Sequence, residues 1–451
     1  MQRIGYGARA VTALVVIALA LASCGPAAAP DPSPTAESPA RTAKPTFTPL
    51  PEDPTDAAPT AVPSQPSAPT DEPTLAPTMT VSSSQAATDQ PTEAPPTATP
   101  RPIKSLHMDS PEYGMQIFPW WRPEVASRDF QMVAEAGFTW AKVNFGWREI
   151  EGAGKGVFDW SRTDEIVRMA EENDIDLVIR VDHQPAWAGG GFPVNGPPDD
   201  YQDLADFFTA MATRYRGRIR AYQVWNEPNL AREWGDQLPD PGEYAKLLRV
   251  CYQAIKAADP NAMVISAGLS PTGTWNEQAR PDDWYLESMY IAMNETMGSS
   301  DSYFDVLGAH APGFKSPPER DPAEVAANQD LGGQRAFAFR RVEDLRAIMV
   351  KYGDTDKQVA ILEFGWTSDP RPESPYNWHA VSEQVKADYL VRAYQYAEAN
   401  WSPWIGLMSL IYICDHDWTT DDEQYWWAIS DPGWPEFKPR PAYTALKNMS
   451  K

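Results

Sequence analysis

Eight apolar runs of strand length alternate with amphipathic segments, and this alternation constrains the fold more than any other feature of the chain. The runs predict strands at 113–118, 140–145, 176–181, 221–225, 263–267, 304–309, 358–362 and 405–411. Helical patterns separate them at 124–136, 163–173, 201–215, 241–258, 337–352 and 382–399, and a closing helix is expected from 443. Parallel strands joined by crossover helices produce this pattern. The sequence therefore predicts an α/β fold, a (β/α)8 TIM barrel.

The first residues of the chain are typical of an export signal. Arg3 and Arg9 provide positive charge, and Val11 to Leu21 is apolar but too short for a comfortable membrane span. This stretch ends in Leu-Ala-Ser-Cys-Gly at 21–25, which resembles a bacterial lipobox. We expect a lipoprotein signal peptide at 1–23, with acyl chains on Cys24 holding the protein to a membrane. The alternative is a plain signal peptide with a coincidental cysteine.

Residues 24–102 are expected to form a disordered linker rich in Pro, Thr, Ser and Ala. Such a segment buries too little apolar surface to offset the entropy of ordering, so it favours a semi-rigid spacer. Every tryptophan follows it, which sets the predicted barrel domain at 103–451. The net charge of −24 argues against nucleic acid as a partner and is compatible with a neutral sugar polymer, or simply with solubility.

Two of the predicted strands are followed by a carboxylate, which suggests a catalytic site at the ends of these strands. The run at 221–225 is followed by Asn226, Glu227 and a proline, and the run at 358–362 is followed by Glu363. An amide can bind a hydroxyl group, and a glutamate can give and take a proton. A single glutamate at a strand end is more often a solvated surface charge, whereas the pair is much more specific. Glycoside hydrolases use two carboxyl groups as their catalytic residues, so two carboxylates at the ends of two strands indicate this chemistry.

The Trp-Asn-Glu-Pro run at 225–228 and the later Glu-Phe-Gly-Trp run at 363–366 resemble the retaining glycoside hydrolases of clan A. The nearest resemblance is to glycoside hydrolase family 39 and its endo-acting relatives, over residues 113 to 446. It implies that Glu227 is the acid/base, Glu363 the nucleophile and Asn226 a ligand of the sugar 2-hydroxyl. Family 39 usually carries a His and, two residues later, a Tyr after the sixth strand. Here His310 is followed by Ala-Pro, which puts its role in doubt.

Further candidates for sugar binding lie near the strand ends, where the active site of this fold is found. The flat faces of tryptophan suit the C–H faces of sugar rings, although long loops also need tryptophan for their own packing. Trp418 is the preferred platform under the reacting ring, with Trp427 as its rival. The other candidates are His310, Asn144, His183, Trp187, Trp147 and Trp366.

These observations predict a retaining β-glycosidase, extracytoplasmic and membrane-anchored, that acts as a monomer on a poly- or oligosaccharide without metal or organic cofactor. Endo action is favoured because the tryptophans are spread over many loops. Two alternatives remain: a transglycosidase that remodels an envelope or matrix polysaccharide, and a non-catalytic glycan-binding lipoprotein. The mechanism implies carboxyl groups about 5–5.5 Å apart and a raised pKa for Glu227. Cys251 and Cys414 are expected to be buried, with a disulfide as the alternative.

Overall fold

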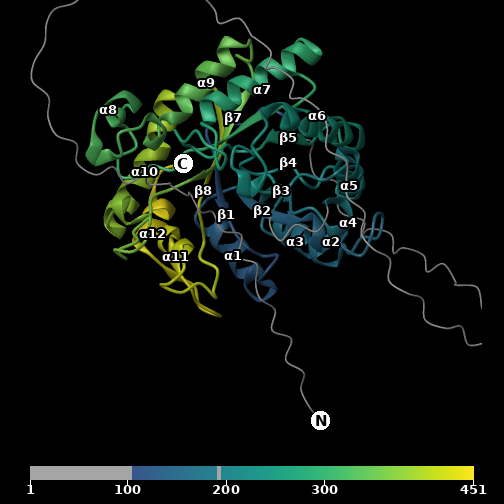
Figure 1. Ribbon diagram of the computed structural model, residues 1–451. Helices are drawn as coiled ribbons and strands as arrows, with labels where there is room; N and C mark the ends of the chain where they lie inside the picture. Colours follow the sequence, from purple (N-terminus) through teal and green to yellow (C-terminus); the bar gives the residue numbers. More distant parts are fainter. Residues whose placement is uncertain (1–103, 190–194) are drawn as a thin grey trace, which may run out of the picture. The chain divides into compact units, whose positions relative to one another are not determined.

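The computed structural model describes residues 104–189 and 195–451, which form a closed barrel of eight parallel strands surrounded by helices (Figure 1). Each strand pairs with the next one in the chain, and the last pairs with the first. The predicted TIM barrel is confirmed, while the signal peptide, Cys24 and the whole linker lie outside the described residues. The strands are β1 (Glu112–Gln116), β2 (Trp140–Gly146), β3 (Asp176–Asp182), β4 (Ala221–Val224), β5 (Met263–Ser266), β6 (Val306–His310), β7 (Gln358–Phe364) and β8 (Ile405–Leu410).

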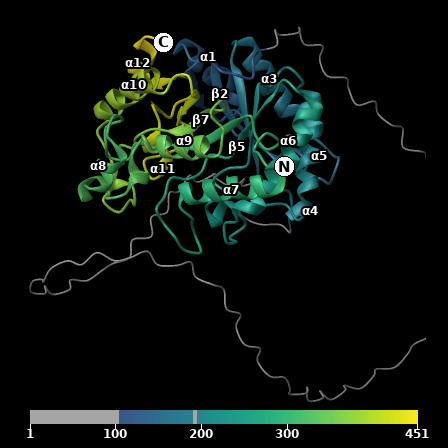
Figure 2. The ribbon, with the colours of Figure 1, turned by 90° about the horizontal axis from the view of Figure 1, so that it is seen from above.

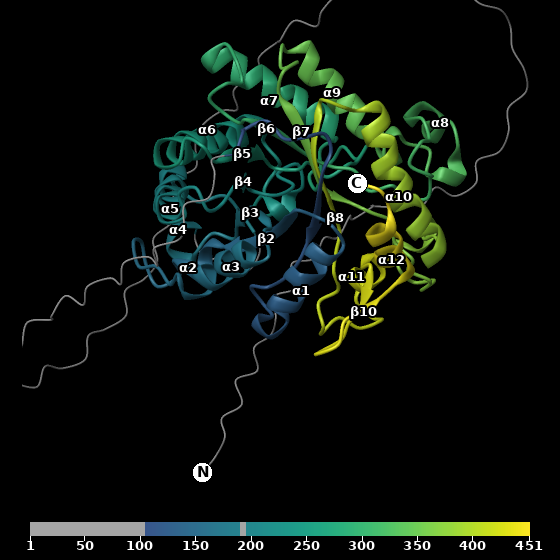
Figure 3. The same cartoon turned by 180° about the vertical axis from the view of Figure 1, so that it is seen from behind.

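Helices between the strands form the outer layer of the barrel. Seen from above, α5, α6 and α7 follow one another along one side (Figure 2), and from behind α10 lies beside α12 (Figure 3). None of the described helices is long and apolar enough to cross a membrane. The longer helices are α1 (Pro123–Glu135), α3 (Ser161–Glu172), α5 (Tyr201–Arg214), α6 (Pro241–Ala258), α7 (Asp282–Met297), α9 (Arg341–Lys351), α10 (Glu383–Asn400) and α12 (Pro441–Asn448), and the short ones are α2 (Trp147–Ile150), α4 (Ala186–Gly189), α8 (Pro322–Ala326) and α11 (Glu423–Trp427).

Side-chain caps explain where several helices begin. Asp240 accepts hydrogen bonds from the backbone of residues 242 and 243 at the start of α6, and Pro241 occupies its first position. Asp200 and Ser382 cap α5 and α10 in the same way. Helix α7 was missing from the sequence prediction, because its apolar and polar residues do not separate onto two faces; it ends at Gly298, whose φ of 78° suits glycine.

Among the residues that the structure describes, three apolar clusters stabilise the domain. The largest lies between strands and helices, and the second fills the barrel interior with residues such as Trp140, Met263 and Leu362. The third, which we call the loop core, packs beneath the loops that follow β6, β7 and β8; its members are Phe314, Val325, Ala336, Phe337, Ala338, Tyr376, Ile411, Tyr412, Cys414, Trp427 and Ala428. Cys251 and Cys414 are both buried, as expected, and neither is part of a disulfide.

Candidate active site

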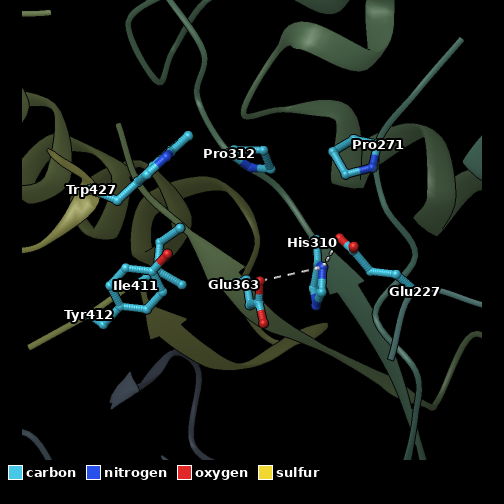
Figure 4. A pocket seen from close by; sticks show the side chains of 8 residues that line it. All are labelled: Glu227, Pro271, His310, Pro312, Glu363, Ile411, Tyr412 and Trp427. Carbon is cyan, nitrogen blue, oxygen red and sulfur yellow. Dashed lines mark hydrogen bonds and ion pairs between the residues drawn. The ribbon is translucent and has the colours of Figure 1, made fainter. Parts of the chain in front are cut away.

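A pocket opens where the strands end, and both predicted carboxylates line it. Glu227 follows β4, and Glu363 is the penultimate residue of β7. Figure 4 shows them on opposite sides of the His310 ring. Each of the two glutamates is at most 3 % exposed, so the pocket isolates its charges from bulk water. The remaining lining residues are Pro271, Pro312, Ile411, Tyr412 and Trp427.

The backbone around Glu227 adopts an unusual conformation that aims its side chain into the pocket. Trp225 and Glu227 have φ values of 70° and 41°, in the left-handed region that non-glycine residues seldom occupy. The Glu227 amide donates to the carbonyl of Gly268 at 3.1 Å, which ties this turn to the end of β5. Such conformations cost about 1–3 kcal/mol each and are typical of functional sites.

His310, the last residue of β6, contacts both carboxylates through one nitrogen. Its Nδ1 lies 2.9 Å from Oε1 of Glu227 and 3.8 Å from Oε2 of Glu363. These two oxygens can be no farther apart than the sum of the two distances, 6.7 Å. Only glycine fits at position 268 beside the imidazole, since a Cβ there would come within 2.2 Å of the ring. His310 therefore lies between the two carboxylates, although the tyrosine expected after it is absent.

Buried cations from β2 and β3 hold Glu363. Lys142 donates to Oε1 of Glu363 at 2.6 Å, and the guanidinium of Arg180 lies 3.7 Å from the same oxygen. Arg180 also pairs with Asp182 at 2.8 Å. Asn144, opposite Arg180 in the strand register, donates to Asp182 at 3.0 Å. The interior of the barrel therefore contains a chain of alternating charges, in which each ion has an opposite partner, as buried ions require.

These contacts set the charge of Glu363. Burial raises the pKa of this carboxyl, but Lys142, His310 and Arg180 together outweigh burial and lower it from 4.5 to about 2. Burial also disfavours the charged form of Lys142 and lowers the pKa of its ammonium group, and the negative charge of Glu363 opposes this change. A glutamate held ionised in a pocket is prepared to act as a nucleophile rather than as an acid.

Glu227 has different partners, and its pKa departs from the expectation. Arg232, from the loop after β4, lies 3.0 Å from Oε2 of Glu227, on the side away from His310. Burial and the charge of Glu363 raise the pKa of Glu227, yet His310 and Arg232 lower it below its ordinary value. The raised pKa predicted for Glu227 is therefore not found, because the prediction rested on the neighbouring carboxylate, and the contacts with His310 and Arg232 could not be read from the sequence.

The other polar candidates surround the pocket without lining it. Asn226 is buried and its amide oxygen accepts from Gln223 at 3.2 Å. His183 lies 2.5 Å from Asp182, the carboxylate that also binds Asn144. Asp182 thus organises both residues. Sugar binding by Asn226, Asn144 and His183 stays a prediction.

The four candidate tryptophans mainly pack. Trp147 is fully buried against Trp187, whose indole donates to the carbonyl of Glu151 at 2.7 Å. Trp366 is fully buried and donates to the carbonyl of Ser316. Trp418 contacts Phe118 and Tyr412 edge-on.

Trp427, the rival of Trp418, is the tryptophan that lines the pocket. Its indole donates to Oε1 of Glu423 at 2.9 Å, and burial raises the pKa of Glu423 to about 8. Among the described residues, Trp427 with Ile411 and Tyr412 is therefore the wall on the β8 side. None of the four preferred tryptophans lines this pocket.

Sequence reasoning also missed the cations. Lys142 and Asn144, like Arg180 and Asp182, are two residues apart in their strands and therefore share the face that points into the barrel. A charged residue within a predicted buried strand was the available signal, since such ions are buried only with partners. Arg232 gave no comparable signal, because it lies in a polar loop.

The fold and the paired glutamates at the ends of β4 and β7 define a clan A glycoside hydrolase. The model of the cellulase family, glycosyl hydrolase family 5, matches residues 105–405, about two thirds of the chain. The chain belongs to this family and is a glycoside hydrolase. The clan inferred from the sequence is confirmed, and a family 39 enzyme is among the similar structures.

Individual relatives are distant. A β-xylosidase of Geobacillus stearothermophilus is 31% identical over 130 residues, which cover 26% of this chain and 25% of that protein. The match thus spans about a quarter of the relative's length. A family 39 glycoside hydrolase from Bacteroides cellulosilyticus WH2 has a TM-score of 0.53 at 20% identity, covering 75% of this chain and 63% of the other. Xylanase 10B of Thermotoga petrophila RKU-1 has a TM-score of 0.50 at 15% identity, covering 76% and 93%. The two structures support the fold.

Proposed function

We propose that this protein is a retaining β-glycosidase that hydrolyses a poly- or oligosaccharide by double displacement. The observation that carries the proposal is the placement of Glu227 and Glu363 on either side of one imidazole nitrogen, with Oε1 of Glu227 and Oε2 of Glu363 no more than 6.7 Å apart. Retaining enzymes bring the two carboxyl groups to about 5–5.5 Å, whereas inverting enzymes need about 6.5–9.5 Å to accommodate a water molecule. The bound on this pair of oxygens is compatible with the retaining separation.

In this mechanism Glu363 attacks the anomeric carbon while Glu227 protonates the departing oxygen. Glu227 then takes a proton from water, which hydrolyses the glycosyl-enzyme. The ion pairs with Lys142 and Arg180 keep Glu363 charged for the first step. The same ion pairs stabilise the Glu363 carboxylate when it is released from the glycosyl-enzyme in the second step.

Glu227 must carry a proton when the leaving group departs, and the Arg232 contact opposes this. Arg232 is only 25% exposed, yet it has a second carboxylate nearby, since Glu233 lies 3.6 Å from it. We propose that substrate binding separates Arg232 from Glu227, because the leaving-group part of the substrate takes the place of this contact. Arg232 then stays paired with Glu233. Loss of that positive charge raises the pKa of Glu227 toward the value that an acid catalyst needs.

The substrate proposed is a β-linked sugar chain cut internally. The names of the family and of its relatives, a cellulase family, a β-xylosidase and a xylanase, support a β-linked substrate. Trp121 and Trp275, on the loops after β1 and β5, are 38% and 58% exposed, which suits contacts with a chain that extends beyond the pocket. We further propose a monomer anchored through lipidated Cys24 outside the cytoplasm, with residues 24–102 as spacer.

Variants of the two glutamates test the roles. Glu363→Gln should abolish turnover of every substrate, because no other group replaces the nucleophile. Glu227→Gln should remain active on aryl glycosides with activated leaving groups, and added azide should increase its rate and yield a β-glycosyl azide. An α-product from Glu363→Gln, with Glu227→Gln inactive on activated substrates, would reverse the two roles.

Product analysis distinguishes the proposed hydrolase from its two alternatives, a transglycosidase and a non-catalytic glycan-binding protein. Incubation with and without an acceptor sugar distinguishes hydrolysis from transglycosylation, since a transglycosidase forms longer products with the acceptor and little free sugar without it. A non-catalytic binding protein would retain glycans and release no product from any of the chains tested. Either result would replace the hydrolase proposal.

A further inference from the structure

An exposed pair of tryptophans lies in the region after β5, away from the pocket wall described above. Trp275 is 58% exposed and Trp284, in the first turn of α7, is 37% exposed. Their rings meet edge to face, with centroids 4.6 Å apart and planes at 71°. The guanidinium of Arg280 lies 5.1 Å from the centre of the Trp275 ring. Trp275 is therefore supported from two directions while more than half of its surface faces water.

The loop that carries Trp275 is fixed at its base by a single buried side chain, Asn229. The amide nitrogen of Asn229 donates to the carbonyls of Ser270 and Arg280 at 2.8 and 3.0 Å, and its oxygen accepts from the Ser270 amide at 2.9 Å. The Asn229 carbonyl accepts from the amide of Arg280. Asn229 thus binds both ends of the loop and closes it into a defined shape.

The tip of the loop is ordered as well. The side chain of Asn276 accepts from the backbone amides of Gln278 and Ala279 at 2.8 and 3.0 Å. Ala279 in turn pairs with Leu230 in an isolated antiparallel bridge. Because these contacts hold the turn that follows Trp275, the indole is presented in one place without needing a ligand to order it.

This loop is joined to the segment that carries the proposed acid/base. Asn229 is two residues after Glu227, and the Glu227 amide bonds to Gly268 at the start of the same loop. Pro271, also in the loop, lines the pocket. Trp275 is four residues beyond Pro271, so its backbone lies within about 14 Å of the pocket lining. In the proposed mechanism Glu227 protonates the oxygen of the leaving group. Because this loop is bonded to the segment that carries Glu227, we infer that the loop lies on the leaving-group side of the pocket.

We propose that Trp275, supported by Trp284, is a stacking platform for a sugar residue of the leaving group of a neutral β-linked chain. The inference rests on the proposed function, since it takes its direction from the role of Glu227. An indole offers an apolar face to the C–H face of a pyranose ring, and the Arg280 guanidinium beside it can donate to the ring hydroxyls. The preformed loop means that little ordering entropy opposes binding.

The test compares substrates that differ only in the leaving group. Cellohexaose and xylohexaose place sugar residues on the leaving-group side, whereas the 4-nitrophenyl β-glycosides of cellobiose and xylobiose place only an aryl group there. In the full-length protein, Trp275→Ala should lower kcat/KM about fivefold on the hexasaccharide that is cleaved and leave the aryl glycoside unchanged. With an end-labelled hexasaccharide, cleavage should move toward the reducing end, because fewer sugars are held beyond the cut.

Trp434→Ala is the matched control. Trp434 is 51% exposed and follows Gly433, which contacts α1 through Arg128, so its loss should change neither substrate nor the cleavage position. Trp275→Phe should retain part of the hexasaccharide activity. Equal losses on both substrate types, or an unchanged cleavage pattern in Trp275→Ala, would overturn the proposal.

A binding measurement separates this inference from the proposed function. Titration calorimetry of either hexasaccharide should show weaker binding when Trp275→Ala is added to Glu363→Gln, whose folding is checked by its thermal transition. Binding that depends on Trp275, together with a wild-type protein that hydrolyses none of the substrates, would refute the function and retain the platform. Absence of binding of both hexasaccharides, or binding that ignores Trp275, would refute the platform.

Discussion

Replacing Glu363 by Gln should destabilise the protein in a pH-dependent way, because folding places this carboxylate among buried cations. Its pKa falls from 4.5 to about 2 in the folded protein, and one unit of pKa corresponds to about 1.4 kcal/mol. The ionised carboxylate therefore contributes roughly 3 kcal/mol to the free energy of unfolding. Removing one partner from a buried ion pair costs a similar amount, about 3–5 kcal/mol, because the other ion is left unpaired.

The sign of the pH dependence follows from the direction of the pKa change. A carboxyl with a lowered pKa stabilises the fold above its unfolded value of 4.5, and that stabilisation is lost as the pH falls toward 2. The variant lacks this group, so its deficit relative to the wild type should be largest near pH 7. The deficit should remain constant down to about pH 5 and then shrink.

Urea denaturation followed by tryptophan fluorescence, at several pH values from 7 to 3, measures this difference. Glu319→Gln is the matched control: Glu319 pairs with Arg392 at 2.6 Å, but both side chains are more than a third exposed, and the variant should lose less than about 1 kcal/mol. A Glu363→Gln deficit below about 1 kcal/mol at pH 7, or one that stays constant to pH 3, would refute the reasoning.

Three further predictions concern the surroundings of the site. Arg232→Gln should move the alkaline limb of the activity profile to higher pH, because it removes a cation that lowers the pKa of Glu227; an unmoved limb would show that Arg232 does not control this proton. The wild type should lose stability relative to Glu423→Gln as the pH rises from about 4.5 to about 8, because the Glu423 carboxyl keeps its proton in the folded protein and loses it in the unfolded one. Equal denaturation midpoints of the two proteins at pH 8 would contradict this. Cys24→Ser with secretion preserved, or removal of residues before Ile103, should release soluble enzyme with full activity, and loss of activity in the folded domain would give the linker a role in the site.

The barrel could be predicted from the sequence because its signal is repeated eight times. Apolar runs and amphipathic segments each report on local burial, so errors at single boundaries do not alter the fold. One boundary mattered for the site: β7 extends through Glu363 to Phe364, whereas the prediction ended it at Leu362. Helix α7 was missed because its residues give no clear amphipathic pattern.

The two glutamates were also predictable, because each follows an apolar run that fixes its place at a strand end. Their partners were harder to find. Lys142 becomes a partner of Glu363 only when the barrel closes and brings β2 opposite β7, and no spacing in the chain shows this. Arg232 contacts Glu227 only through the turn after β4. The charge state of Glu227 was therefore misjudged although the residue itself was identified.

The loop core has a consequence for how such an enzyme can diversify. Ile411, Tyr412 and Trp427 form one wall of the pocket and belong to an apolar cluster distinct from the clusters that hold the barrel together. The carboxylates and their cations, in contrast, are attached to the strands. Substitutions within the loop core can thus reshape the wall while the reacting groups keep their geometry. Selection for a new sugar preference could act on one part of this protein and leave the chemistry of the other part intact.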